Sequence, residues 1–271
     1  MKLIDCFMYF DEDLILDIRL NTLGKVVDKF IICEATRDHA GNKKNLKFNH
    51  NNFSAFKNKI EYIVVDDMPI NVKPPKKNWH ENHARDQFQR NALNRGIKKY
   101  DSNDLIMISD IDEIPDPKRI NEFDIKKKYA CFLQKNYQSK INLLNITNQN
   151  WPGTKICQKK YLKSPQWLRN IKTKKRSFWK LFGDNQPQII ENGGWHFSFL
   201  KQPEGIKTKI NSYSHQEFNS EKFTNIKNIE EKISKGVDLF ERDIKYQRVN
   251  VDESFPDYIN NNKEKFKDWI I

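Results

Sequence analysis

Short runs of consecutive apolar residues alternate with segments of helical periodicity in the first part of this sequence, and this alternation most constrains the fold. The apolar runs cover residues 2–10, 26–33, 60–65 and 105–108. They are apolar throughout rather than at every second position, which is typical of strands buried on both faces of a parallel sheet. Between them lie helical patterns at 11–24, where we expect Asp11 to cap the helix, and at 79–100. This alternation predicts an open α/β sheet.

Acidic residues gather where these predicted strands end. Glu34, Asp66, Asp67, Asp110 and Asp112 directly follow apolar runs. In open α/β sheets, ligands bind just beyond the carboxyl ends of the strands. We therefore expect a polar binding site at this edge of the sheet.

The composition supports a folded domain of ordinary size. The chain has 271 residues, of which 37% are hydrophobic and 12% aromatic, and this apolar content argues against intrinsic disorder. No stretch approaches the ~20 apolar residues that a membrane span needs, and Asp5 follows the N-terminus too closely for a secretory signal. We expect a cytoplasmic protein, and the net charge of +12 leaves open a peripheral contact with an anionic membrane.

The four cysteines give no sign of a metal site or a disulfide framework. Cys6, Cys33, Cys131 and Cys157 lie far apart and form no CxxC or Cys/His pair with zinc-ligand spacing. We interpret Cys6, Cys33 and Cys131, which lie within apolar runs, as small buried hydrophobic residues, and the lack of pairing motifs favours a reducing compartment.

The pattern changes after residue 117. We expect strands at 129–134 and 193–200, one helix that begins at Pro203 and another that ends at Gly236. The predicted organisation is a catalytic domain over 1–218, with a donor half of about 1–117 and an acceptor half of about 118–218, and a helical tail over 219–271 packed on it.

The strongest chemical signal is the tripeptide Asp110-Ile111-Asp112. Two carboxylates one residue apart at the end of a strand can both reach one divalent cation. Mg²⁺ and Mn²⁺ prefer such oxygen ligands and leave room for phosphate oxygens. The alternative is a polar turn in which Asp112 caps a helix.

Three further sets of residues could serve the same site. His196, in the aromatic segment 193–200, is equally consistent with a third Mn²⁺ ligand and with a core histidine. Arg19 and Arg85 could bind a diphosphate, whereas we assign Arg90 to an ion pair on the helix surface. The segment 214–218 contains Glu217 in a polar loop, which could supply a general base or be an ordinary surface loop.

Three segments together resemble glycosyltransferase family 17. They are EDLILDIRLNTLGKVVDKFIICEATRDHAG (12–41), LIMISDIDEIP (105–115) and GGWHFSFLKQPEGIKTKI (193–210). The likeness extends from the first strand to about Phe218, is weaker over 138–188, and is slight in the tail.

The resemblance implies a GT-A-type nucleotide-sugar-binding fold, UDP-GlcNAc as donor and an inverting transfer. In its terms Asp110 and Asp112 hold the metal and the diphosphate. Glu12, Arg19 and Glu34 lie near the nucleotide, and Trp195 and His196 belong to the last matching segment.

The resulting hypothesis is a metal-dependent N-acetylglucosaminyltransferase that uses Mn²⁺ or Mg²⁺. Its acceptor would be a glycan hydroxyl on a glycoprotein, a lipid-linked sugar or a surface polysaccharide. A carboxylate, first Glu217 and second Glu191, would deprotonate that hydroxyl.

Two other classes of function stay open. One is a basic module for nucleic acid or an anionic surface, based on the stretch 169–180 (RNIKTKKRSFWK), although the hypothesis itself requires no nucleic acid. The other is a metal-dependent nucleotidyltransferase or phosphotransferase that uses the same pair of aspartates.

Overall fold

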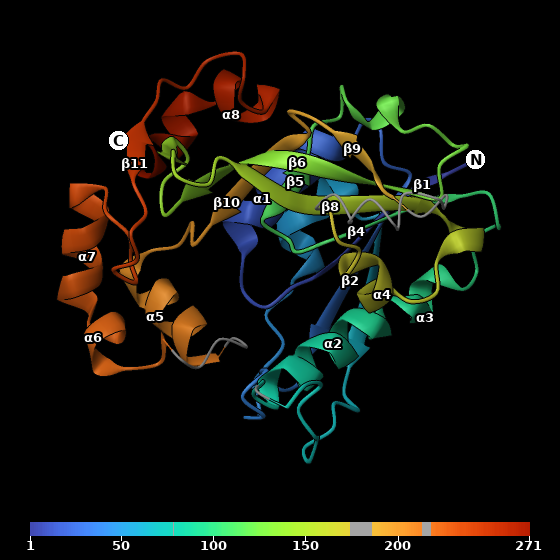
Figure 1. The fold of residues 1–271 in the computed structure, drawn as a ribbon, viewed down its shortest axis with the longest axis horizontal. Coiled ribbons are helices and arrows are strands. Elements are labelled where there is room, and N and C mark those ends of the chain that lie inside the picture. The colour runs from blue at the N-terminus through green and yellow to red at the C-terminus, as the bar shows by residue number, and fades with distance from the viewer. Residues whose placement is uncertain (78, 174–185, 213–217) are drawn as a thin grey trace, which may run out of the picture.

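The computed structural model describes residues 1–77, 79–173, 186–212 and 218–271. The strands are β1 (Leu3–Met8), β2 (Lys29–Ala35), β3 (Ile60–Val65), β4 (Leu105–Ser109), β5 (Glu113–Pro115), β6 (Tyr129–Gln138), β7 (Leu143–Asn145), β8 (Asn150–Gln158), β9 (Gln188–Ile190), β10 (Gly194–Ser198) and β11 (Tyr246–Arg248). The helices are α1 (Asp13–Leu23), α2 (Asn82–Ala92), α3 (Asn94–Ile97), α4 (Pro165–Arg169), α5 (Pro203–Ser212), α6 (Glu221–Thr224), α7 (Ile226–Lys235) and α8 (Asp257–Asn261). The strands form one sheet with helices on both of its faces (Figure 1).

The parallel block of the sheet contains the four strands predicted from the apolar runs. In the order β4-β1-β2-β3, each strand pairs in parallel with its neighbours. Ile4 in the central strand β1 lies opposite Lys29 in β2 and Ile106 in β4. The predicted α/β class is confirmed.

The strands after residue 117 extend the sheet beyond β4. β8 pairs antiparallel with β4 and β6, and β7 pairs antiparallel with β6 and β11. β10 pairs with β6 in parallel and with β5 antiparallel. The sheet is therefore mixed, and its largest parallel block is formed by β1 to β4.

Each face of the parallel block carries its own apolar core, which explains why the strands are apolar throughout. On one face Phe7 packs in a cluster with residues of α1 and with Phe266 near the C-terminus. On the other face Cys6 packs in a cluster with Leu93 and with residues of α2 and α3. These four side chains are fully buried, and burial of a large apolar side chain contributes roughly 1.5–3 kcal/mol.

Two helix boundaries differ from the prediction. The segment 79–100 forms α2 and α3 rather than one helix, and the chain tightens between them, since the Leu93 N–H bonds to the Arg90 carbonyl three residues back. The first helix has Glu12, not Asp11, at its N-cap position, and Glu12 Oε2 accepts the N–H groups of Phe10 and Asp11. Glu12 therefore stabilises the turn before the helix.

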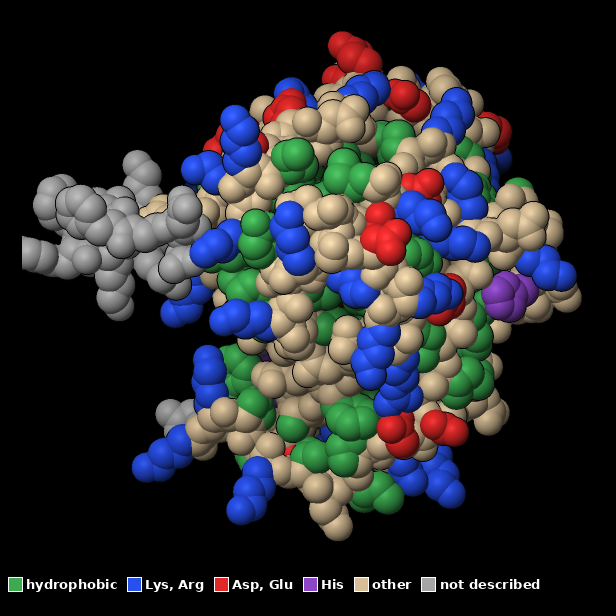
Figure 2. Space-filling model, turned by 90° about the vertical axis from the view of Figure 1, so that its right-hand side faces the viewer, with side chains coloured by type: hydrophobic (Ala, Val, Ile, Leu, Met, Phe, Trp, Pro, Cys, Tyr) green, Lys and Arg blue, Asp and Glu red, His purple; other side chains and the backbone are tan. Residues whose placement is uncertain are grey.

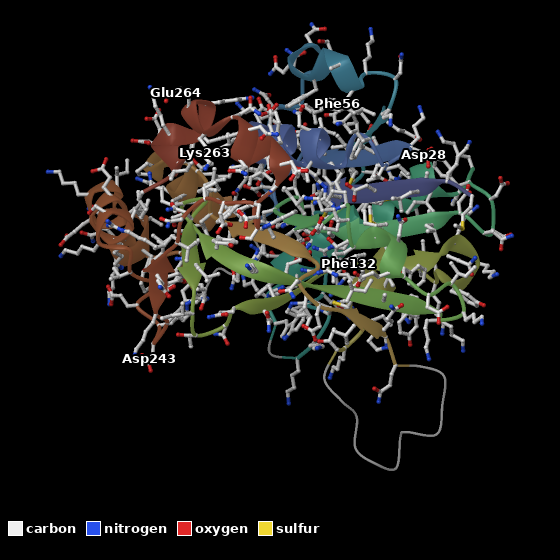
Figure 3. All side chains as sticks on the ribbon, turned by 90° about the horizontal axis from the view of Figure 1, so that it is seen from above. Asp28, Phe56, Phe132, Asp243, Lys263 and Glu264 are labelled. Carbon is white, nitrogen blue, oxygen red and sulfur yellow. The ribbon has the colours of Figure 1, made fainter. Side chains whose placement is uncertain are left out.

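The C-terminal part of the chain packs on the sheet and on α1. Helices α5 to α7 share a separate apolar cluster that includes Ile210 and Ile229, and α8 lies beside α1. The expected helical tail also contributes strand β11 to the sheet. Asp243, Lys263 and Glu264 of this part lie at the periphery of the molecule, whereas Phe132 of β6 lies inside it (Figure 3).

Cys6, Cys33 and Cys131 are buried, as predicted; Cys157 is buried as well, and all four are unpaired. Burial raises the pKa of Cys33 and Cys157 to about 12 and that of Cys131 to about 11. Because the thiolate is the reactive form, these residues act as core side chains.

The described helices and one face of the surface bear on the expected contact with a membrane. Within the described ranges, no helix is long and apolar enough to cross a bilayer. On the face shown in Figure 2, Lys and Arg side chains lie among acidic, apolar and uncharged ones. On this face the basic side chains are therefore interspersed with side chains of other types.

Candidate active site

The chain order of the strands predicts where a ligand binds. From β1 the chain proceeds to β2 and β3 on one side, and β4 then pairs with β1 on the other side. The direction of winding therefore reverses between β1 and β4, and ligands of open α/β sheets bind at the carboxyl ends of strands at such a switch point. Phe10 follows β1 there, and Asp110 follows β4.

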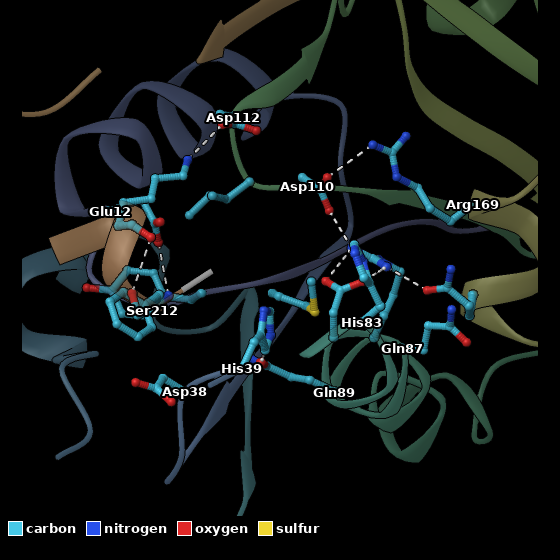
Figure 4. A pocket seen from close by; sticks show the side chains of 18 of the residues that line it. Glu12, Asp38, His39, His83, Gln87, Gln89, Asp110, Asp112, Arg169 and Ser212 are labelled. Carbon is cyan, nitrogen blue, oxygen red and sulfur yellow. Dashed lines mark hydrogen bonds and ion pairs between the residues drawn. The ribbon is translucent and has the colours of Figure 1, made fainter. Parts of the chain in front are cut away.

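A pocket of about 1250 Å³ opens at this point. Its lining comes from the ends of β1 and β4, the loop after β2, α2, α4, α5, β8 and β10. Figure 4 shows Asp110 and Asp112 on one side of the pocket, with Asp38, His39 and Gln89 on the opposite side. Small-molecule pockets commonly measure about 300–1,000 Å³, so this one has room for more than one small ligand.

A chain of ion pairs joins four elements along one wall of the pocket. It runs Asp86–Arg90–Asp110–Arg169–Glu113, from α2 through the end of β4 and α4 to β5. Arg90 lies 2.9 Å from Asp110 Oδ1, and Arg169 lies 3.0 Å from Asp110 Oδ2. We call these five residues the arginine ladder; it contains one carboxylate more than it has guanidinium groups.

The arginine ladder keeps Asp110 ionised. Burial opposes its charge, but Arg169 and Arg90 outweigh burial and hold the pKa of Asp110 well below its usual value. The Asp110 side chain is still 37% exposed, and it faces the pocket. Both carboxylate oxygens are already engaged by arginine, so Asp110 can hold these two cations in position.

Asp112 belongs to a second group of charged residues in the pocket, with Lys209, His196, Glu12 and Lys201. Its Oδ2 is 3.3 Å from Lys209 Nζ on α5, and its Oδ1 is 3.7 Å from His196 Nε2 on β10. Glu12 is near Lys201 and Lys209, and these two cations lower its pKa although burial opposes them. Asp112 lies in the turn between β4 and β5, and no helix begins there, so it is not a helix cap.

His196 is held in one orientation by two neighbours. Its Nδ1 lies 3.1 Å from Asn136 Oδ1, and its ring stacks on Trp151 with centroids 4.5 Å apart. An amide oxygen is an acceptor, so this contact assigns the proton to Nδ1 and leaves a lone pair on Nε2. Burial lowers the pKa of His196 more than the negative charge of Asp112 raises it. The lowered pKa favours the neutral ring.

The donor set suits a divalent cation that is shared with a substrate. Asp112 Oδ1 lies 3.7 Å from His196 Nε2, which carries a lone pair when the proton is on Nδ1. No group of three or more His, Cys, Asp or Glu side chains among the described residues is arranged to hold a metal. Mg²⁺ commonly uses one or two carboxylates and takes its other ligands from water and phosphate. The residues therefore fit an ion completed by a bound phosphate, with Asp112 and His196 better placed than Asp110.

The backbone around His196 requires glycine. Gly194 has a φ of 131°, and a Cβ atom there would lie 2.2 Å from the Ile114 carbonyl oxygen. Only glycine allows β10 to approach β5 this closely. The pairing places His196 opposite Glu113 and so brings the segment 193–200 to the motif after β4.

Three residues expected to bind the nucleotide lie elsewhere. Arg19 is fully buried and bonds to both carboxylate oxygens of Asp5 at 2.7 Å. Glu34, also fully buried, accepts hydrogen bonds from Tyr62 and from the backbone after residue 46. Arg85 donates to the carbonyl oxygens of His39, Pro69 and Ile70. These side chains hold the loops and strands beneath the pocket, and they do not line it.

Of the two carboxylates considered as the base, the structure describes only Glu191. Glu191 lies exposed on the turn before β10 and is not among the residues that line the pocket. Glu217 lies outside the described residues. Of the nucleotide and metal residues predicted from sequence, the pocket contains Glu12, Asp110, Asp112 and His196.

Among the pocket residues that the sequence did not predict as site residues are Arg90, Arg169, Lys209 and Trp151. Arg90 was interpreted as a surface ion pair, yet it is buried and lines the pocket. Arg169 opens the basic stretch 169–180, and Lys209 lies in the segment 193–210, so both were within segments that had been singled out. Trp151, at the start of β8, carried no local signal.

Comparisons with known proteins agree on one family. A sequence model described as Glycosyltransferase family 17 matches residues 1–267, which includes most of the tail. Human beta-1,4-mannosyl-glycoprotein 4-beta-N-acetylglucosaminyltransferase is 23% identical over 233 residues, covering 75% of this chain and 42% of the relative. The enzymes of that name from Rattus norvegicus and Mus musculus are 23% and 22% identical, with 41% of each relative covered. The chain thus spans about two-fifths of the length of these curated relatives.

Proposed function

Because the chain belongs to glycosyltransferase family 17, we propose that it is an inverting glycosyltransferase with a GT-A-type fold. It transfers N-acetylglucosamine from UDP-GlcNAc to a hydroxyl group of a glycan. The donor is proposed from the human, rat and mouse relatives, whose names specify N-acetylglucosaminyl transfer.

The observation that carries this proposal is the position of Asp110-Ile111-Asp112. The tripeptide leaves β4 at the switch point of the sheet and lines the pocket. His196 and Lys209 from the C-terminal half of the chain meet Asp112 there. A pocket built from both halves suits a reaction that joins a donor and an acceptor.

The side chains of the pocket suggest distinct roles in the transfer. Asp112 and His196 would hold Mn²⁺ or Mg²⁺, which when bound neutralises diphosphate charge as the nucleotide leaves. Lys209 and the arginines of the ladder offer cations to the same phosphates. Asp110 keeps Arg90 and Arg169 in place through both of its carboxylate oxygens.

A carboxylate must accept the proton of the acceptor hydroxyl as it attacks the anomeric carbon. Glu191 does not line the pocket and is therefore badly placed for this role. Glu217 stays our candidate, since it follows α5 by five residues in the sequence and Ser212 at the end of α5 lines the pocket.

The acceptor is proposed to be a sugar chain carried by a glycoprotein, a lipid or a surface polysaccharide. The pocket volume of about 1250 Å³ leaves space for an acceptor sugar beside the donor. Trp151 and Phe10 line the pocket with aromatic surface against which a sugar ring can pack.

The structure gives less support to a nucleic-acid module. Arg169, the first residue of the basic stretch 169–180, turns inward to Asp110 and Glu113, and its side chain is 15% exposed. Residues 174–180 of that stretch lie outside the described residues. A nucleotidyltransferase would use the same pocket, so the test below includes it.

The test is to incubate the protein and its Asp112→Asn variant with UDP-GlcNAc, Mn²⁺ and a panel of glycans. The proposal expects UDP release together with a glycan heavier by one N-acetylhexosamine. Transfer at phosphorus would instead release UMP, if phospho-N-acetylglucosamine is transferred, or N-acetylglucosamine 1-phosphate, if the uridylyl group is transferred, and either product would favour a phosphoryl or nucleotidyl transfer. Absence of any glycan product across lipid-linked and free acceptors contradicts the proposed transfer.

A further inference from the structure

Glu113 is the one ladder member that does not line the pocket, although it directly follows Asp112 in the sequence. Its side chain is fully buried at the start of β5. A buried carboxylate is costly unless its oxygens are paired. The partners of Glu113 are therefore informative about its role.

Each oxygen of the Glu113 carboxylate contacts a residue of the pocket wall. Oε1 accepts hydrogen bonds from Trp151 Nε1 and from Arg169 Nη2, both at 2.6 Å. Oε2 accepts the backbone N–H of Asp110 at 3.1 Å. Trp151, Arg169 and Asp110 all line the pocket, and they come from β8, α4 and the end of β4.

Through its partners Trp151 and Arg169, Glu113 is connected to His196 and Asp110 in the pocket. Trp151 stacks on His196 with an interplanar angle of 20°, so the orientation of the indole fixes one face of the imidazole. Arg169 bonds to Asp110, which in turn bonds to Arg90. One buried side chain thus connects the imidazole side of the pocket with its arginine side.

We infer that Glu113 is a positioning residue that aligns Trp151 and Arg169 before the donor binds. The inference rests on the proposed function, because it assigns these two side chains to the walls of the donor and acceptor pocket. Charged hydrogen bonds of this kind hold a side chain in one geometry. Catalysis depends on such preorganisation, since small misplacements of reacting groups are costly.

A purely structural carboxylate is the alternative. It would lower the stability of the fold when replaced, but folded molecules would keep a normal pocket. The two possibilities differ in what happens to Trp151 and to the turnover of folded protein, and both quantities can be measured.

The decisive variant is Glu113→Gln, which keeps the side-chain size and removes the charge that faces Arg169. A matched control is Glu122→Gln. Glu122 pairs with Arg119 at 2.6 Å, but both side chains are 43% exposed and neither lines the pocket. Two readouts are needed: the indole N–H resonance of Trp151, identified by its loss in Trp151→Phe, and kcat and KM for UDP-GlcNAc.

The inference expects the Trp151 resonance to move in Glu113→Gln and to stay in Glu122→Gln. It expects kcat to fall by about 100-fold in Glu113→Gln, as misplacement of reacting groups can produce. KM for the donor should rise by a smaller factor than kcat falls, because Lys209 and Arg90 keep their own partners Asp112 and Asp86 when Arg169 loses the charge of Glu113. Either an unmoved resonance or a moved resonance with unchanged kcat overturns the inference.

A second variant protects the test against a failure to fold. Trp151→Phe removes the indole N–H and keeps the pair between Glu113 and Arg169. The inference expects kcat to fall by about tenfold there, and an unchanged kcat contradicts it. If the parent protein does not turn over UDP-GlcNAc, the proposed function fails, while the indole resonance still decides whether Glu113 holds Trp151.

Discussion

Lys209 Nζ lies 3.3 Å from Asp112 Oδ2 and links helix α5 to the motif that follows β4. Burial would discharge this ammonium group, but Asp112 and Glu12 outweigh burial and raise the pKa of Lys209 above its usual value. Lys209 therefore carries a full positive charge at neutral pH. An anionic ligand near Asp112 would therefore contact this ammonium group, and a cation bound by Asp112 would lie beside it.

Replacing Asp112 tests the chemistry of this place. We expect Asp112→Asn to lower the rate of glycosyl transfer by about 100-fold or more. The variant keeps the size of the side chain but removes the negative charge that pairs with Lys209 and would bind the cation. Mn²⁺ should then no longer raise the melting temperature in the presence of UDP. Asp243→Asn, an exposed change at the edge of the molecule (Figure 3), is the control. Retained Mn²⁺-dependent activity in Asp112→Asn rules out the proposed cation site.

Arg19 should matter for stability rather than for nucleotide binding. Its side chain and that of Asp5 are both fully buried, and their ion pair measures 2.7 Å. Arg19→Met leaves a buried carboxylate without its cation, and we expect the free energy of unfolding to fall by roughly 3–5 kcal/mol. Arg119→Met, in the exposed pair with Glu122, should cost less than about 1 kcal/mol.

Urea denaturation measures both losses, and calorimetry on the folded fraction measures UDP affinity. If Arg19→Met is as stable as the parent but binds UDP more weakly, Arg19 contributes to nucleotide binding and this prediction is contradicted.

Lys155 should make stability depend on pH in the alkaline range. Burial and the neighbouring Arg169 lower its pKa from 10.5 to about 8 in the folded protein. Between these two values the unfolded chain binds more protons than the folded one, so this residue makes the free energy of unfolding rise with pH. From pH 7 to pH 9 we expect a gain of about 1 kcal/mol from Lys155 alone.

The measurement compares the parent with Lys155→Met by urea denaturation at both pH values. The difference between the two proteins isolates Lys155 from the buried cysteines, whose raised pKa values act in the opposite direction above their usual value of 9.0. Lys127→Met, at an exposed position, is the control. If the free energy of unfolding depends on pH equally in the parent and in Lys155→Met, the lowered pKa of the buried Lys155 is contradicted.

Glu217 is tested by a change that preserves its size. If it is the base, Glu217→Gln lowers kcat by about 100-fold or more, because general base catalysis contributes about 10²–10⁴-fold. UDP affinity should not change, since proton transfer does not contribute to nucleotide binding. Glu191→Gln, on an exposed turn outside the pocket, should behave as the parent. A loss confined to Glu191→Gln reverses this assignment.

The sequence predicted the parallel block and the motif after β4 because both are local patterns. Apolar runs report burial on two faces, and Asp110 and Asp112 lie beyond the end of β4, where side chains are free to face a ligand. Glu34 does not line the pocket, because β2 continues to Ala35. Its side chain is therefore still within the strand and faces Tyr62 rather than the pocket.

The remaining pocket residues depend on pairings between distant parts of the chain. Trp151 reaches the site through the pairing of β8 with β4 and β6, and Lys209 reaches it because α5 follows β10. Arg169 becomes a pocket residue only when α4 packs near the end of β4. Such placements arise from tertiary packing, and the spacing of residues along the sequence does not contain them.

The central claim is that the pocket between β1 and β4 binds UDP-GlcNAc with a divalent cation at Asp112. Calorimetric titration of UDP-GlcNAc into the parent protein, with and without Mn²⁺, tests it most directly. The account predicts binding that is at least about tenfold tighter with Mn²⁺, and loss of this difference in Asp112→Asn. It is contradicted if UDP-GlcNAc does not bind, or if it binds equally well in both proteins whether or not Mn²⁺ is present.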